Sequence, residues 1–196
     1  MAGVKSEVSL LAVTLSILIP ALPERLALLK ELTEFLDRQA RGLPVEILAL
    51  VDNRQRSTGA KENGLVRIAK GQYVTFIDDD DWVADTYVAD ILQALEDNAG
   101  VDSVMFDVAL YLYGTFSKTF RYGQEYMWEE TEECIFREPG PLMCWSRDIM
   151  VRYPLPDLTI DEDSLWIRQG PWKFETVSQV RIPRVLYFYR AVPGHS

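Results

Sequence analysis

Residues 59–81 read GAKENGLVRIAKGQYVTFIDDDD, and the order of patterns in this stretch decides the fold. Its first part predicts a helix over residues 59–69, which we expect Gly71 to close because glycine readily takes the left-handed conformation found after helices. Its second part, QYVTFI, is a continuous apolar run that predicts a buried strand. Four adjacent aspartates, Asp78 to Asp81, follow that strand. The stretch is therefore predicted to be a helix, a strand and an acidic turn at the carboxyl end of the strand.

The same alternation of helix and strand extends on both sides of this stretch. Apolar runs predict further strands at residues 13–20, 45–51 and 103–113. Leucines at helical spacing predict a helix before Gly42, and a later helix through Leu95 is expected to have Asp85 as its N-cap. Because the strands lack clean alternation and are separated by helices, we expect a doubly wound, mostly parallel α/β sheet with helices on both faces.

The rest of the chain is less regular. Residues 114–140 are acidic and aromatic, and we expect a loop or β-ribbon there rather than a separate domain. Short helices are predicted at residues 146–153 and 163–169, and a closing strand at VLYFYR, residues 185–190. We therefore interpret residues 1–196 as a single domain.

Composition limits the classes of function. The net charge of −10 and the pI of about 4.6 disfavour sequence-independent clamping of nucleic-acid phosphates. The run at residues 8–20 holds about a dozen apolar residues where a membrane helix needs ~20, so we interpret it as a buried strand and expect no transmembrane segment. Two cysteines are too few for a disulfide framework and favour a reduced, cytoplasmic setting.

The aspartate run requires a physical explanation. In an extended chain, Asp78 with Asp80 and Asp79 with Asp81 would each lie about 7 Å apart. At an effective dielectric constant near 20, each pair would repel by roughly 2 kcal/mol, which a divalent cation such as Mg²⁺ or Mn²⁺ would offset. The alternative is a solvated acidic turn that caps the next helix. Asp52 ends the preceding strand and should face the same crevice, where ligands of such sheets collect.

Together these segments resemble the family 2 glycosyltransferases of GT-A fold. The matching segments are SILIP, VEILALVD, the stretch at residues 59–81, DEDSLWIR and VLYFYR. The family typically shows a first strand ending in I-P, a second ending in D, an A-R-N-x-G-x-x-x-A-x-G-x-Y segment, F-x-D-x-D-D and a later E-D motif. The resemblance extends from about Leu15 to Arg190. The variant S-T-G-A-K-E-N with four aspartates also resembles glycosyltransferase-like proteins of bacteriophages.

The resemblance implies a donor site at the strand ends. In that donor site, Asp52 would accept a hydrogen bond from the nucleobase, usually uracil, and Asp78 would contact the ribose or the nucleobase. Lys61 would offset diphosphate charge, and the alternative is a solvated lysine on a helix face. For Asp52 the alternative is capping of the following turn. The implied nucleotide-sugar-binding residues are Pro20, Asp52, Lys61, Asn63, Asp78 and Asp79.

The resemblance also implies a metal site for Mn²⁺ or Mg²⁺ that bridges the diphosphate. Asp80 is the implied ligand, and Asp81 is either a second ligand or an indirect partner. His195 is the only histidine and is a further candidate ligand, although it could equally be a tail residue. The usual polar residues after the first I-P are replaced here by residues 21–25, so a customary nucleotide contact is missing or moved to Glu24 or Arg25.

Glu162 and Asp163 match the E-D motif, which implies a catalytic base that takes the proton of the acceptor hydroxyl. We assign that role to Asp163, although the register allows Asp161 with Glu162 equally. The alternative is an acidic first turn that complements the helix dipole.

We therefore expect a metal-dependent, inverting glycosyltransferase that moves a hexosyl or pentosyl group from a nucleotide-sugar, most often UDP-linked, to a hydroxyl acceptor. The resemblance implies a nucleotide-binding half at about residues 8–112 and an acceptor-binding half at about residues 113–196. The acceptor could be a glycan, a lipid, a protein or a modified DNA base. A catalytically silent nucleotide-binding module and a nucleotidyltransferase are the alternatives.

Overall fold

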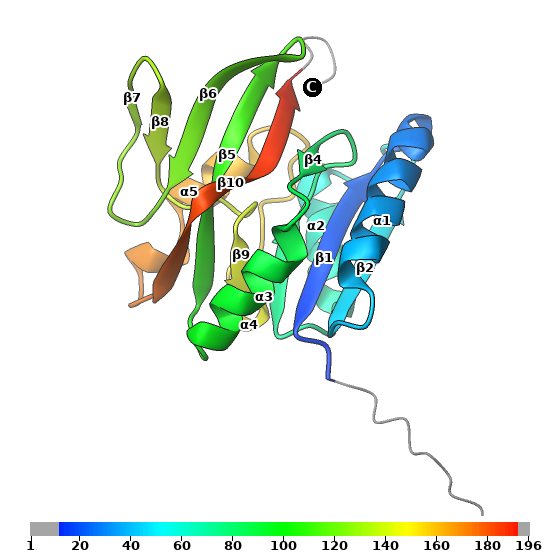
Figure 1. The fold of residues 1–196 in the computed structure, drawn as a ribbon, viewed down its shortest axis with the longest axis horizontal. Coiled ribbons are helices and arrows are strands. Elements are labelled where there is room, and N and C mark those ends of the chain that lie inside the picture. The colour runs from blue at the N-terminus through cyan, green and yellow to red at the C-terminus, as the bar shows by residue number, and fades with distance from the viewer. Residues whose placement is uncertain (1–11, 192–196) are drawn as a thin grey trace, which may run out of the picture.

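The computed structural model describes residues 12–191, which form one mixed sheet with helices on both faces (Figure 1). Its strands are β1 (Leu15–Ala21), β2 (Val45–Val51), β3 (Tyr73–Phe76), β4 (Trp82–Val83), β5 (Ser103–Leu112), β6 (Thr115–Tyr122), β7 (Glu129–Glu130), β8 (Cys134–Arg137), β9 (Cys144–Ser146) and β10 (Gln179–Ala191). Its α-helices are α1 (Leu26–Ala40), α2 (Thr58–Ile68), α3 (Tyr87–Asp97), α4 (Arg147–Arg152) and α5 (Glu162–Arg168), with 3-10 helices η1 (Pro23–Arg25) and η2 (Pro171–Lys173). No helix within residues 12–191 is both long and apolar enough to cross a membrane.

The order of the sheet places the first three strands together. β2, β1 and β3 are parallel neighbours, and the order continues through β9, β5, β6 and β8 to β7. β10 runs parallel to β5 and pairs antiparallel with β4. The expected α/β class is confirmed, although β6, β7 and β9 bring antiparallel pairs into the second half. One cause is the tight turn at Tyr113 and Gly114, whose positive φ values suit a hairpin between β5 and β6.

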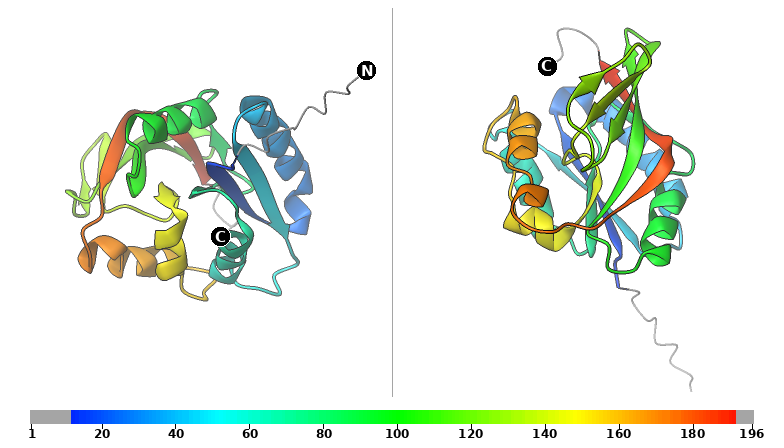
Figure 2. Two further views of the ribbon diagram at one scale, coloured as in Figure 1. Left: turned by 90° about the horizontal axis from the view of Figure 1, so that it is seen from below. Right: turned by 90° about the vertical axis from the view of Figure 1, so that its left-hand side faces the viewer.

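The helices form two layers around the sheet. α1 contacts α3 on one face and α2 contacts α4 on the other, as Figure 2 shows from below. β1 lies between these layers, and all of its residues are buried. β2, at the edge of the sheet, keeps partly exposed residues. Burial on both faces explains why the first strand is a continuous apolar run.

Two helix boundaries differ from the sequence-based expectation. α3 begins at Tyr87 with Thr86 as its N-cap, so the prediction of Asp85 as N-cap is wrong. α2 ends at Ile68, and Gly71 is not among the described glycines with positive φ. Gly71 instead permits a close approach: its N–H donates to Ser16 Oγ at 2.8 Å, and a Cβ there would lie 2.6 Å from Ser16 N.

Three tryptophans pack against one another behind the second acidic motif. Trp145 of β9, Trp166 of α5 and Trp172 of η2 have ring centroids between 5.3 and 5.8 Å apart. Trp166 Nε1 also donates to the carbonyl of Tyr153 at 2.7 Å. Because these rings are fixed from three elements, they hold α5 in place, and α5 carries Glu162 and Asp163.

Replacing Gly71 with alanine should destabilise the protein by about 2 kcal/mol, because the added methyl group would overlap the backbone of Ser16. Urea unfolding measures this difference. Gly64→Ala in α2 is the matched control, since no atom lies within 4 Å of its added methyl group. We expect that variant to be about 0.5–1 kcal/mol more stable than the parent. Equal stability of Gly71→Ala and the parent would contradict the close approach.

Candidate functional site

The four aspartates form a turn rather than an extended segment. The N–H of Asp81 donates to the carbonyl of Asp78 at 3.1 Å and closes a four-residue turn between β3 and β4. The expectation of two extended, like-charged pairs is therefore wrong. Because the turn changes direction at Asp79 and Asp80, the four carboxylates meet different surroundings.

Asp79 and Asp81 point into the protein. Asp79 accepts hydrogen bonds from the Leu22 N–H at 2.8 Å and from Arg25 Nη1 at 2.9 Å. Asp81 accepts from the Tyr187 hydroxyl and the Arg190 N–H, both at 2.7 Å. Both carboxylates are almost fully buried, at 2% and 1% exposure, with both oxygens engaged. The geometry argues against a nucleotide contact by Asp79 and against metal ligation by Asp81.

Asp78 and Asp80 remain available to a ligand. Asp78 is half-buried, and its carboxylate has no hydrogen bond or ion pair within the described part of the chain. Burial, and then the charges of Asp81 and Asp163, raise its pKa well above the usual value. Asp80 keeps 29% of its side chain exposed and lies 2.9 Å from Arg25 Nη2. Two accessible carboxylates on adjacent sides of a turn suit a hard divalent cation, which takes its other ligands from water and phosphate.

Asp52 and Lys61 meet at the carboxyl ends of β1 and β2. Asp52 Oδ1 accepts from the Arg54 N–H at 3.2 Å and lies 3.6 Å from Lys61 Nζ, which donates to the Ala21 carbonyl at 3.4 Å. Asp52 Oδ2 is buried and has no partner among the described residues. An unfilled buried acceptor is suited to the ring N–H of a bound base. Pro20 is buried within β1 beside this pair.

Asn63, in contrast, is occupied by the fold. Its amide donates to the Leu155 carbonyl at 2.8 Å and its carbonyl accepts from the Leu155 N–H at 3.0 Å. The N–H of Gly59 donates to the Leu158 carbonyl at 3.0 Å. A Cβ on Gly59 would lie 1.9 Å from the Pro156 carbonyl oxygen, so only glycine allows this approach. The geometry argues against a nucleotide contact by Asn63 and shows that α2 is fixed to the loop before α5.

This attachment brings Glu62 against the second acidic motif. Carboxylate oxygens of Glu62, Glu162 and Asp163 lie within 4.8 Å of one another. Glu62 is only 5% exposed, and the Oε2 atoms of Glu62 and Glu162 are buried without partners among the described residues. The sequence-based site did not include Glu62. Its signal was the helical spacing to Leu65 and Val66, which places a glutamate on the apolar face of α2.

The environment of this cluster favours protonation or a bound cation. Burial raises the pKa of Glu162 to about 7 and the pKa of Asp163 to about 6, the latter against the lowering charge of Arg137. Burial and the charges of Asp163 and Asp78 raise the pKa of Glu62 well above its usual value. A carboxylate with a pKa near 6 can accept a proton at neutral pH. Three oxygens at this spacing could alternatively hold one cation.

The positions of Asp161 and Asp163 bear on which of the two is the aspartate of the E-D motif. Asp161 and Asp163 are both exposed, but a carboxylate oxygen of Asp163 lies in the cluster, whereas Asp161 stands at the N-cap of α5 with a φ of 67°. This arrangement favours Asp163 over Asp161 as the base. The charge of Asp163 also raises the pKa of Asp78, so the two acidic motifs lie close enough to interact electrostatically. His195 lies outside the described residues.

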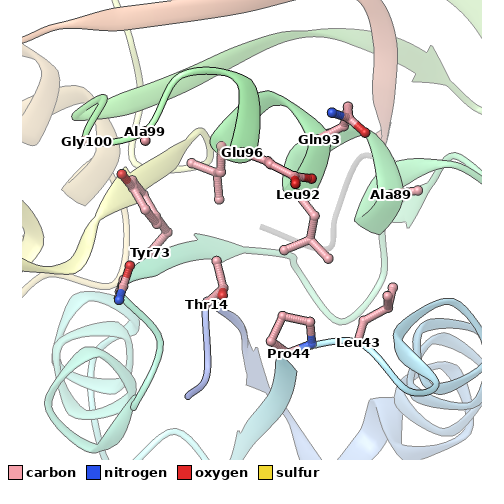
Figure 3. Close-up of a pocket in the computed structure, with 12 residues that line it drawn as sticks. Thr14, Leu43, Pro44, Tyr73, Ala89, Leu92, Gln93, Glu96, Ala99 and Gly100 are labelled. Atoms are coloured by element: carbon pink, nitrogen blue, oxygen red, sulfur yellow. The ribbon is translucent and has the colours of Figure 1, made fainter. Parts of the chain in front are cut away.

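A cavity lies at the opposite edge of the sheet. A cavity of about 550 Å³ is lined by Thr14, Pro44 and Tyr73 together with the α3 residues Leu92 and Glu96 (Figure 3). Thr14, Pro44 and Tyr73 stand at the amino ends of β1, β2 and β3, opposite to the carboxyl ends that carry the aspartates. We therefore locate the site from its carboxylates and not from cavity size.

Without metal, the protein should be more stable at pH 5.5 than at pH 8. The folded pKa values of Asp163 and Glu162, about 6 and about 7, exceed their ordinary values of 3.8 and 4.5. The folded chain therefore binds more protons than the unfolded chain, and this stability is lost as pH rises through 6 and 7. Thermal unfolding in EDTA measures it. Glu62→Gln, which removes a neighbouring charge, should weaken the dependence, and a higher melting temperature at pH 8 would contradict the cluster.

Solved structures of glycosyltransferases share this fold. TarS 1–349 of S. aureus in complex with UDP-GlcNAc has a TM-score of 0.61 and 14% identity, over 93% of this chain and 60% of that chain. Glucosyl-3-phosphoglycerate synthase of Mycobacterium tuberculosis, in complex with Mn²⁺, UDP and phosphoglyceric acid, has a TM-score of 0.56 and 15% identity, over 92% of this chain and 72% of that chain. The mannosyltransferase PcManGT of Pyrobaculum calidifontis, in complex with GDP-Man and Mn²⁺, has a TM-score of 0.56 and 14% identity, over 93% and 58%.

The sequence comparison identifies the family. The chain spans 37% of the longer TarS chain and 60% of TarS 1–349, so it is shorter than these relatives. None of the relatives named here is a bacteriophage protein, and the bacteriophage-type resemblance is not supported by them. A comparison with curated protein sequences finds no significant match. The family model described as Glycosyl transferase family 2 matches residues 31–155, and the chain therefore belongs to the family 2 glycosyltransferases, with a GT-A-like fold.

Proposed function

We propose that this protein is a metal-dependent, inverting glycosyltransferase that moves a sugar from a UDP-linked donor to a hydroxyl acceptor. The observation that carries the proposal is the carboxylate cluster of Glu62, Glu162 and Asp163, which lies close enough to the acidic turn for the charge of Asp163 to raise the pKa of Asp78. One motif would hold the donor and the other would activate the acceptor. In this proposal residues 8–112 form the donor half and residues 113–196 the acceptor half of one domain.

Asp80 and Asp78 are the residues that would hold Mn²⁺ or Mg²⁺. The Asp80 side chain is 29% exposed, and the carboxylate of half-buried Asp78 has no partner in the described chain. When bound, the cation would offset the negative charge that develops on the diphosphate leaving group. The Mn²⁺ complexes of the synthase and of PcManGT support this assignment.

We assign Asp52 as the residue that binds the nucleobase of the donor. Its unpartnered Oδ2 would accept a hydrogen bond from the imide N–H of uracil. The positively charged Nζ of Lys61 lies 3.6 Å from the other oxygen of this carboxylate, Oδ1. The UDP complexes of two relatives support a uridine donor, whereas PcManGT was solved with GDP-Man.

Asp163 is assigned as the catalytic base. Its carboxylate would take the proton of the acceptor hydroxyl while that oxygen attacks the anomeric carbon. The new bond to the acceptor oxygen forms as the bond to the diphosphate oxygen breaks, and the nucleoside diphosphate leaves with the electron pair. Attack from the face opposite to the leaving group inverts the anomeric centre.

The acceptor would enter beside the strand hairpin of the second half. Trp128 is 63% exposed, whereas Trp145 and Trp166 are buried in the tryptophan cluster. Trp128 also lies 5.7 Å from the guanidinium of Arg137, whose charge acts on Asp163. We assign Trp128 as the stacking face for a hydroxyl-bearing acceptor, which is a glycan, a lipid, a protein or a modified DNA base.

Asp80→Ala should weaken Mn²⁺-dependent UDP binding by at least about tenfold, because it removes a charged ligand. Calorimetric titration of UDP with and without Mn²⁺ measures this change. Asp85→Ala, an exposed aspartate just after the turn, is the matched control and should bind as the parent does. The same UDP affinity with Mn²⁺ and with EDTA in the parent protein would refute metal dependence.

Asp163→Asn should lower kcat by at least about 100-fold with UDP affinity unchanged, because the base is lost while the donor site remains. In the parent, kcat/KM should fall as pH drops below about 6, the pKa of Asp163. A donor screen by UDP or GDP release, followed by mass spectrometry of products, supplies the assay. A larger loss in Asp161→Asn than in Asp163→Asn would move the base to Asp161.

Two results would replace this function with another. UDP and metal binding without transfer to a broad acceptor panel would indicate a silent binding module. Release of pyrophosphate from a nucleoside triphosphate and a sugar phosphate would indicate a nucleotidyltransferase.

A further inference from the structure

Arg25 places a fixed positive charge on the acidic turn. Its Nη1 donates to Asp79 Oδ1 and its Nη2 lies beside Asp80 Oδ2, both at 2.9 Å. The guanidinium therefore bridges a buried carboxylate and an accessible one, with 3% and 29% of their side chains exposed. Arg25 itself keeps 19% of its side chain exposed. A cation already stands where the divalent metal of the proposed function would bind.

The two ends of this bridge are not equivalent. Asp79 is also fixed by the Leu22 N–H at 2.8 Å, so the contact between Arg25 and Asp79 belongs to the framework of the protein. The N–H of Arg25 donates to the Leu22 carbonyl at 3.0 Å, which fixes the backbone of η1. Asp80 has no hydrogen bond of that kind from the backbone of η1. The contact with Asp80 can therefore be given up while Arg25 stays on Asp79.

Asp80 cannot bind the guanidinium of Arg25 and a divalent cation equally well at the same time. A guanidinium and a divalent cation on the same carboxylate repel each other at close range, and this repulsion is strong where water is partly excluded. A guanidinium also offers a planar fork of N–H donors that matches phosphate oxygens. A diphosphate arriving with the metal would therefore attract the same group that the metal displaces.

We propose that Arg25 is a displaceable counter-ion of the donor site: it occupies Asp80 in the metal-free protein, competes with the divalent cation for that carboxylate, and donates to the diphosphate once the cation is bound. This inference rests on the proposed function and adds a residue to it. It gives Arg25 opposite effects on two affinities, since it weakens metal binding and strengthens nucleotide binding. A merely structural arginine would not produce that combination.

The test compares Arg25→Met with the parent in two titrations of the full chain. Mn²⁺ affinity without nucleotide is measured from free Mn²⁺ by electron paramagnetic resonance, and UDP affinity at saturating Mn²⁺ by calorimetry. We expect Arg25→Met to bind Mn²⁺ about tenfold more tightly and UDP about tenfold more weakly, since one charge-assisted contact changes in each case. Mn²⁺ affinity that is unchanged or weaker, or UDP affinity that is unchanged, overturns the proposal.

Further variants separate charge, shape and folding. Arg152→Met removes an exposed arginine at the end of α4 that pairs with Glu175. This control variant should match the parent in both titrations. Arg25→Lys keeps the charge without the fork, so it should bind Mn²⁺ like the parent and UDP more weakly. Should Arg25→Met not fold, Arg25→Gln keeps an amide donor for Asp79 and must show the same opposite shifts.

The proposed function and this inference fail in distinguishable ways. If the parent binds Mn²⁺ but neither UDP nor GDP, the proposed function is refuted, and tighter Mn²⁺ binding by Arg25→Met than by the parent still supports the competition for Asp80. If UDP binds with Mn²⁺ and both affinities are the same in the two proteins, the proposed function stands and the role of Arg25 is refuted. Absence of Mn²⁺ binding in every variant contradicts both.

Discussion

Asp79 and Asp81 are buried carboxylates that need hydrogen-bond donors, and the donors that reach them organise the site. An unpartnered buried charge would cost on the order of several kcal/mol, so donors must reach both side chains. They come from distant parts of the chain, namely the loop after β1 for Asp79 and the end of β10 for Asp81. The turn is thereby held between the first and last strands of the described chain. The availability of Asp78 and Asp80 to a ligand follows from this restraint.

Several carboxylates of the two acidic motifs and of their surroundings are held close together. Lys61 and Arg25 are already engaged with Asp52 and with the acidic turn. On the acceptor side, Glu62 and Glu162 have buried oxygens without partners in the described chain. Carboxylates held in this way lower the stability of the empty protein and favour whatever brings a proton or a cation. The same arrangement supplies a base whose pKa lies near neutrality.

Much of the fold could be predicted because it rests on local pattern. β2 was predicted with its observed bounds, Val45–Val51, and a ribbon was expected where β6 to β8 lie. The positions of Asp52 and Asp78 at the edge of the sheet could be predicted because each follows a strand end. The partners of Arg25 and Glu62 could not be predicted, since they lie far away in sequence: Arg25 meets Asp79 across 54 positions. The roles expected for Asn63, Asp79 and Asp81 lost support for the same reason, because the polar atoms of these side chains are hydrogen-bonded to distant parts of the protein.

By itself, the sequence determined the order of strands and helices, the family and the edge of the sheet at which acidic side chains gather. These follow from periodicity and from motifs that are contiguous in the chain. Only the tertiary structure decided which of four adjacent aspartates are buried and which remain available to a ligand, and that a glutamate of α2 joins the second acidic motif. The physical reason is that adjacent residues share a sequence signal but not a set of hydrogen-bond donors, and those donors come from segments that meet only when the chain has folded.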